Sequence, residues 1–251
     1  MALFELDWLG GTAERLFHKH RGDRLEQIPW SALRTTHLGD GERDGMRSVW
    51  TQSAHQEWCA AGAFTAMIEH LLLARAPVDL IGMTGSFVAD EMVHVELACR
   101  MATLYGGGIE LQVDPSTIAP PVSEGVSELL AVCELALRVS CVGESFSLPI
   151  LAQELSMARD PVNRAVLQRI VADEAPHAKV GWLILDWALP RLDAVGIEHL
   201  TEVARDAVDA LIPVLQRAPA QAGFFEQILK SRVAGPLADR GLVVQERLFG
   251  A

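Results

Sequence analysis

The sequence predicts an all-α protein built around four long helices with one long crossover connection. Half of the 251 residues are hydrophobic, which is enough for a sizeable core. Apolar residues with helical spacing recur through four stretches between about residues 48 and 189, and Gly- or Pro-containing segments separate them. The connection at about 106–122 is the longest of these, and a bundle whose second and third helices run parallel needs such a crossover.

We expect residues 1–251 to form a single domain, because the chain is long for one four-helix bundle and short for two domains. The polar N-terminal part, residues 1–47, is expected to wrap over the surface, with a short helix at residues 11–20. A lid over a substrate site is the alternative. Three glycines among charged residues predict a loop: Gly39, Gly41 and Gly45.

The first long helix is predicted from Ser48 to about Ala76, where Pro77 ends it. Apolar residues spaced three and four apart follow Glu57 along this stretch, Phe64 among them. An apolar stripe of this kind faces the core of a bundle. The carboxylate of Glu57 is therefore expected to point inward.

The second and third helices are predicted at Val78–Tyr105 and at about Ser123–Arg159. The glycines of Gly106–Gly108 form a strong stop signal for the second helix. In the third helix Pro149 lies five residues after Glu144, so we expect a bend or a bulge there. A bulge of this kind accompanies function in many helices, and a packing kink is the equal alternative.

The fourth helix has a clear start signal, because Asp160 is a good N-cap and Pro161 fits the first helical position. It is predicted to run to about Leu189 and to stop before Pro190. Pro176 lies inside this helix and removes one backbone hydrogen bond. Local irregularity is therefore expected around it.

Residues 190–251 are expected to add two amphipathic segments, at about 197–217 and 221–248. Breaks between and within them are predicted at Pro219 and at Gly235-Pro236. These accessory helices would cover the bundle, form a homodimer surface or shape a substrate entrance. The sequence does not choose among the three.

A repeated D-E-x-x-H motif is the feature that carries chemistry. It occurs as Asp90-Glu91-Met92-Val93-His94 and as Asp173-Glu174-Ala175-Pro176-His177. Residues three apart on a helix lie on one face, so the Glu and His of each motif point the same way. A carboxylate oxygen and an imidazole nitrogen aimed at one point form a pair of metal ligands.

Each motif has a partner glutamate in the preceding helix. Glu57 precedes Glu91 by 34 residues, and Glu144 precedes Glu174 by 30. Four carboxylates in a core without cations would cost several kcal/mol each, and two divalent metal ions would neutralise them. One E-x-x-H alone would be read as a solvated surface pair. Two copies, each with an upstream glutamate, favour a dinuclear metal site over chance spacing.

Three segments carry a resemblance to a known superfamily: DEMVHVELACRMATLYGG, CVGESFSLPIL and DEAPHAKVGWLILDWAL. They resemble the ferritin-like di-iron carboxylate superfamily, in which two helices give one Glu each and two others give Glu-x-x-His. The resemblance covers about residues 48–189. It implies a ferritin-like four-helix bundle that binds two iron ions, with manganese as the alternative. The metal ligands that it implies are Glu57, Glu91, His94, Glu144, Glu174 and His177.

The resemblance assigns the first three of these ligands to one metal and the last three to the other, with Glu91 and Glu174 as bridges. A metal-bound histidine usually donates its second N–H to a carboxylate. Asp90 and Asp173 are candidates for this partner, and each is expected to reach the histidine of the other motif. The alternative for each aspartate is a solvated position on its helix.

Two residues near Glu144 are candidates for a substrate pocket, namely Cys141 and Leu148. For Cys141, buried packing is the alternative. Small residues close to the ligands would either leave room for a substrate or allow close helix packing, and both interpretations stay open: Ala60, Ala61, Ser140, Gly143 and Ser145.

The predicted function is that of a non-haem di-iron oxidase or oxygenase, which activates O2 to oxidise a small organic substrate. Electrons would come from a separate reductase or from the substrate. The alternatives are a ferroxidase or peroxide-scavenging protein and a non-catalytic helical scaffold. Tyr105, the only tyrosine, lies eleven residues after His94. That is about 16 Å along a helix, which argues against a radical-generating ribonucleotide reductase subunit.

The net charge of −12 gives no basic footprint for nucleic acid or an anionic membrane. We find no signal-like start and no apolar run that would span a bilayer, so a cytoplasmic location is expected. No C-x-x-C pair is present, and free thiols in a reducing compartment are expected. The cysteines are Cys59, Cys99, Cys133 and Cys141.

Overall fold

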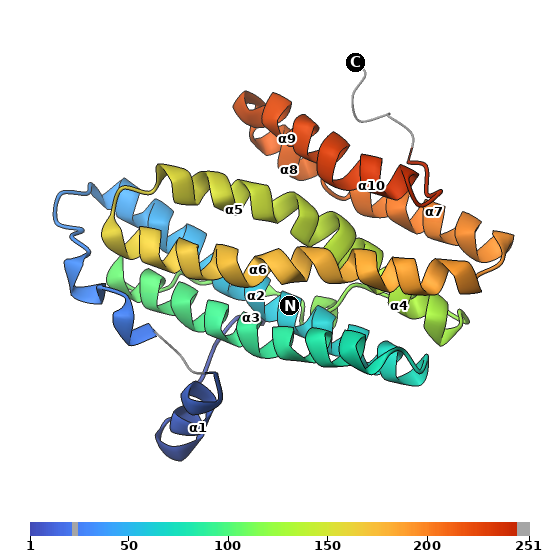
Figure 1. Cartoon of the computed structure of the whole chain (residues 1–251). Helices are drawn as coiled ribbons and strands as arrows, with labels where there is room; N and C mark the ends of the chain where they lie inside the picture. The colour runs from blue at the N-terminus through green and yellow to red at the C-terminus, as the bar shows by residue number, and fades with distance from the viewer. Residues whose placement is uncertain (22–24, 245–251) are drawn as a thin grey trace.

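The computed structural model describes residues 1–21 and 25–244. Most of these residues are helical and the sheet that they form has only two short strands, which confirms the all-α fold class. Figure 1 shows four long helical segments lying side by side. They are α2 (Asp40–Leu73), α3 (Val78–Leu104), the continuous run of α4 (Glu128–Ala136), a π-helical segment (Leu137–Glu144) and α5 (Ser145–Met157), and α6 (Pro161–Ala188).

The helix α2 begins at Asp40, eight residues before the predicted start at Ser48. The prediction of a loop at Gly41 and Gly45 is therefore wrong. Local side chains compensate for the glycines, because Glu42 accepts a hydrogen bond from the Gly39 amide at 2.8 Å and caps the helix. Ion pairs three residues apart then support the first turns.

The predicted ends of α3 and the start of α6 are confirmed. Gly106 and Gly107 adopt positive φ values of 119° and 103°, as a glycine stop signal requires. Asp160 accepts hydrogen bonds from two amides at the start of α6. The start of α4 at Glu128 is five residues later than Ser123, because Ser127 is the residue that caps it.

The predicted bulge in the third long helix is present. The π-helical segment ends at Glu144, and Pro149 follows in α5. Pro149 has no N–H to donate to the carbonyl of Ser145, so regular α-helical bonding is interrupted here. The hydroxyl of Ser145 donates to the Ser140 carbonyl at 3.0 Å, five residues back. Pro176, in contrast, is accommodated inside α6 without a break.

The N-terminal residues contact the crossover. The two-residue strand β1 (Ala2–Leu3) pairs antiparallel with β2 (Gln112–Val113) of the crossover, which also holds a 3-10 turn at Pro115–Thr117. The predicted short helix is confirmed as α1 (Gly11–Arg21), which projects away from the long helices in Figure 1. Two further 3-10 turns follow, at Leu25–Gln27 and Trp30–Ala32.

The C-terminal helices lie along one side of the long helices in Figure 1. The expected break near Pro219 is confirmed, but Gly235-Pro236 does not interrupt the helix. A π-helical turn there runs directly into α10, and a proline in the first turn of a helix needs no N–H partner. The elements are α7 (Ala194–Asp209), α8 (Ile212–Arg217), a 3-10 turn (Pro219–Gln221), α9 (Ala222–Ile228), the π turn (Leu229–Ala234) and α10 (Gly235–Ala238).

Two apolar clusters fill the interior. One gathers the C-terminal half of α6, the α4 run and the helices α7 and α9. The other gathers the N-terminal halves of α2 and α6 and the C-terminal half of α3. None of the helices in the described part of the chain is long and apolar enough to cross a membrane.

Gly181 of α6 lies at a close approach between two long helices, and it provides a test of the packing. A Cβ atom there would lie 2.7–2.8 Å from Ser140, the Ala136 carbonyl and Cys141. We expect Gly181→Ala to lower the free energy of unfolding by roughly 1–3 kcal/mol through overpacking. Chemical denaturation monitored by circular dichroism measures this change.

The matched control is Gly82→Ala in α3, where an added Cβ meets nothing within 4 Å. This exposed helical glycine should gain up to about 1 kcal/mol from helix propensity. Equal stabilisation by both substitutions would contradict the close approach at Gly181.

Candidate metal centre

The six predicted ligands come from the four long segments. Glu57 lies on α2, Glu91 and His94 on α3, Glu144 at the end of the π-helical segment, and Glu174 and His177 on α6. Four of the six are at most 3% exposed: Glu91, His94, Glu174 and His177. Along α3 and α6 they fall between the residues of the two apolar clusters. Apolar side chains therefore enclose a polar centre from both ends.

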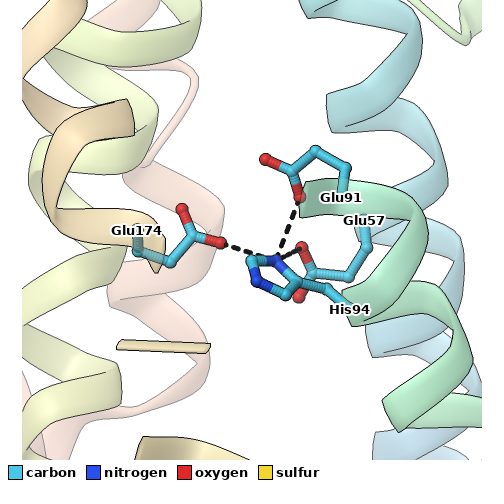
Figure 2. Close-up of side chains that lie close together, drawn as sticks. All are labelled: Glu57, Glu91, His94 and Glu174. Atoms are coloured by element: carbon cyan, nitrogen blue, oxygen red, sulfur yellow. Dashed lines mark ion pairs between the residues drawn. The ribbon is translucent and has the colours of Figure 1, made fainter. Parts of the chain in front are cut away.

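Three carboxylates converge on the Nδ1 atom of His94, as Figure 2 shows. The distances to this atom are 3.1 Å from Glu174, 3.3 Å from Glu91 and 3.7 Å from Glu57. One ligand atom from each of these four residues lies within 4.8 Å of all the others, so the group can hold a metal ion. In Figure 2 Glu174 reaches the cluster from the opposite side to the other three.

The second histidine repeats this arrangement. The Nδ1 atom of His177 lies 2.9 Å from Glu91 and 3.0 Å from Glu174. Each of these two carboxylates therefore lies between both imidazoles. The rings of Phe64 and Phe87 pack on His177, with the Phe87 centroid at 4.1 Å, and restrict its orientation.

The two aspartates contact the far side of the histidines. Asp173 lies 3.2 Å from Nε2 of His94, and Asp90 lies 3.6 Å from Nε2 of His177. Each aspartate reaches the histidine of the other motif, as the paired motifs predict. Arg169, which belongs to neither motif, holds Asp173 in place through a contact of 2.6 Å. With Nε2 directed at a carboxylate, Nδ1 is the nitrogen left to face the centre.

Several buried polar atoms of the centre have close neighbours without hydrogen-bond geometry. Both carboxylate oxygens of Glu91 and the Nδ1 atom of His94 form no hydrogen bond with any described residue. Leaving such atoms unsatisfied in a core is costly. Ligand atoms that aim at a common point, rather than at one another, have this geometry. The residues therefore fit a bound cation.

The four glutamates form two pairs whose pKa values shift in opposite directions. Burial raises the pKa of Glu57 to about 7 and raises the pKa of Glu144 well above its usual range. Burial acts on Glu91 and Glu174 in the same direction, but contacts with the two histidines outweigh it. The pKa of Glu91 is lowered, and that of Glu174 falls to about 2.

The histidines hold their protons tightly. Burial alone would lower the pKa of both rings, but Asp173 and the glutamates keep the pKa of His94 well above its usual range. The glutamates Glu174 and Glu91 likewise raise the pKa of His177 to about 9. Without metal, two imidazolium ions therefore neutralise two carboxylates, and the other two carboxyls tend to stay protonated.

Glu144 lies outside the group of four residues whose ligand atoms converge, and its carboxylate accepts a hydrogen bond from the Ser147 hydroxyl at 3.2 Å. It lines a cavity of about 500 Å3. Its walls come from α2, from the crossover and from the π-helical segment. Neither Cys141 nor Leu148, the predicted pocket residues, lines this cavity. Cys141 instead faces Gly181 of α6, because a π turn is wider than an α turn and residues three apart no longer share its face. Cys59 of α2 also lines the cavity.

Some of the small residues near the ligands leave space for a substrate, and others allow close packing of the helices. Ala60 and Gly143 line the cavity and leave space next to Glu144. Ser140 serves close packing against α6, and Ser145 bonds the carbonyl of Ser140 and the ring nitrogen of Trp182.

Comparisons of the chain with protein-family models, with curated proteins and with solved structures find no match. The assignment of the centre therefore depends on its own residues and geometry.

Proposed function

We propose that the chain is a ferritin-like di-iron protein that uses O2 to oxidise a small organic substrate. The observation that carries this proposal is the paired arrangement of the centre. Two Glu-x-x-His motifs face each other with Nδ1 directed inward and Nε2 directed at an aspartate, and Glu91 and Glu174 lie between both histidines. A metal-bound histidine usually donates its second ring N–H to such an outer partner.

In this proposal two metal ions would be held by six residues: Glu57, Glu91, His94, Glu144, Glu174 and His177. Glu91 and Glu174, which lie close to both histidines, would each serve both ions. A pair of ferrous ions supplies the electrons that reduce O2, and manganese is the alternative for the same ligand types. The chain's own residues fix the ligands, and the apolar clusters on either side keep bulk water away.

The cavity at Glu144 favours an organic substrate over iron as the substrate. About half of its lining is alanine, valine, isoleucine and proline, and the polar side chains include two hydroxyls and a guanidinium but no carboxylate other than Glu144 itself. A path for iron entry needs oxygen ligands along its walls, because iron ions carry a hydration shell that must be replaced. An apolar organic molecule needs no such ligands.

Anaerobic titration with ferrous iron, followed by mixing with O2, tests the proposal. We expect about two irons per chain and rapid O2 consumption by the loaded protein. If the protein binds neither iron nor manganese, the proposal is wrong, and the non-catalytic helical scaffold is the interpretation that remains. Rapid O2 consumption with release of ferric iron to a chelator would favour a ferroxidase instead.

The role of Asp173 as the outer hydrogen-bond partner of His94 can be tested by substitution. We expect Asp173→Asn to weaken metal binding about ten- to a hundredfold, because the amide no longer holds the Nε2 proton of His94 by charge. Competition with a chromophoric chelator measures this affinity. Asp209→Asn, an equal change at an exposed position of α7, is the control. Equal affinities of the two variants would mean that Asp173 has no role toward the metal.

A further inference from the structure

The cavity at Glu144 contains one cationic side chain, Arg138. It lies in the π-helical segment, six residues before Glu144. At a rise of 1.5 Å per residue, the two positions are separated by roughly 9 Å or less along the helix. The cavity is therefore lined both by a candidate metal ligand and by a guanidinium group.

Arg138 lacks the partners that other arginines of the chain have. Arg47, Arg100, Arg169 and Arg240 each contact a carboxylate. Within the described part of the chain no carboxylate lies within ion-pairing distance of Arg138, and its buried Nε atom has no hydrogen-bond partner. A buried donor without a partner is costly, so a bound anion at this position would be stabilised.

The remaining walls are largely apolar, with Cys59, Ser116 and Thr117 as the polar exceptions. Ala60 and Ala63 of α2 form one side, Val139 forms another, and Ile118 to Pro121 of the crossover close the cavity. Gly62 fixes this last wall, because a Cβ there would lie 2.1 Å from the Cγ2 atom of Ile118 and 3.1 Å from its carbonyl oxygen. The crossover therefore lies directly on α2 and leaves the space beside it open.

We propose that this cavity binds a small carboxylic acid whose carboxylate pairs with Arg138 and whose apolar body extends toward Glu144. The planar guanidinium matches a carboxylate with two parallel hydrogen bonds. The apolar walls bury the rest of the molecule. The inference names the substrate class of the proposed oxidase and rests on that proposed function for its biological role, whereas binding itself does not depend on metal.

Direct binding of two carboxylates, hexanoate and benzoate, to the metal-free protein tests the inference. Isothermal titration calorimetry should detect at least one of them, and hexanamide, a neutral analogue of hexanoate, should bind much more weakly. In Arg138→Gln, binding of the acid should weaken about ten- to a hundredfold, as expected for loss of a charged hydrogen bond. Arg205→Gln, the same charge change on an exposed face of α7, should bind like the wild type.

A second variant checks the location. Ala60→Leu fills the cavity from α2 and should block both the acid and the amide, while its circular dichroism spectrum stays that of a folded helical protein. The inference is overturned if neither acid binds at millimolar concentration, if hexanamide binds as well as hexanoate, or if Arg138→Gln binds like Arg205→Gln. Tighter binding of inorganic phosphate than of either acid would overturn the carboxylic acid class.

The two proposals can fail separately. A chain that binds two irons and consumes O2 but binds neither acid loses only the substrate assignment. A chain that binds an acid through Arg138 but takes up no metal keeps the cavity and loses the oxidase function. In iron-loaded Arg138→Gln, the iron content should stay unchanged, since Arg138 contacts none of the six candidate ligands within ion-pairing distance.

Discussion

Glu91→Gln is expected to weaken metal binding by at least about a hundredfold, because loss of an outer partner alone costs ten- to a hundredfold. Glu91 is fully buried and lies within 3.3 Å of the Nδ1 atoms of both histidines. A neutral amide in that place offers one weaker oxygen ligand and no charge to either metal ion. Iron content after anaerobic loading and desalting should therefore fall from about two per chain to below one.

Glu96→Gln is the matched control for this prediction. Glu96 is on the same helix and is 1% exposed, but its carboxylate contacts Arg100 and His18 instead of the centre. Loss of its charge should lower stability and leave the iron content unchanged. Full iron content in folded Glu91→Gln would show that the carboxylate between the two histidines is not a ligand.

The sequence was sufficient to predict which helix faces point inward. Glu91 and His94, like Glu174 and His177, are three apart on regular α-helix, and this spacing fixes their common direction without any knowledge of the fold. The contact of each aspartate with the histidine of the other motif also followed from the paired motifs. Local periodicity was reliable here because α3 and α6 are regular through their motifs.

The cavity could not be predicted in the same way. The π-helical segment changes the turn between Arg138 and Glu144, so α-helical spacing misplaced Cys141. Cys59 and the crossover meet at the cavity through tertiary packing, which no local pattern encodes. Arg138 resembles any helical arginine in the sequence, and only the absence of a nearby carboxylate in the described residues sets it apart. The proline five residues after Glu144 was the one available signal for the irregular turn.

The early start of α2 has a similar cause. Two glycines among charged residues favour a loop by composition. The local cap and ion pairs of the first turns are joined by a long-range contact, in which Arg47 donates to the carbonyls of Gly107 and Gly108 after α3, at 2.8 and 2.9 Å. A contact between residues some sixty positions apart therefore adds to the local interactions that extend the helix beyond its predicted start.

Metal binding by this centre is expected to depend steeply on pH. In the metal-free protein His94 and His177 tend to carry a proton each, and Glu57 and Glu144 tend to be protonated. Metal ligands must be deprotonated, so binding of two divalent ions should release three to four protons per chain near pH 7. The apparent affinity should rise strongly between about pH 6 and pH 8, as shown by chelator competition and by titration of the released protons in weak buffer.

The same groups determine how the stability of the metal-free protein changes with pH. The pKa of His177 is raised to about 9, so the stabilisation from its protonated form is complete below its ordinary pKa and disappears as the pH rises through 9. The pKa of Glu57 is raised from 4.5 to about 7, so the cost of ionising it in the folded, metal-free protein builds up as the pH rises between these two values and is complete above pH 7. The metal-free protein should therefore lose stability progressively from about pH 5 to about pH 9.

Metal loading should remove this loss, because two divalent cations carry the same charge as the four protons that they displace. The difference in melting temperature between the loaded and the metal-free protein should therefore grow from pH 6 to pH 9. A constant difference across this range, together with release of fewer than two protons, would mean that bound metal does not replace the protons of this centre. In that case the ligand set would have to lie elsewhere in the chain, and the convergence of carboxylates on His94 would be a buried ion-pair network only.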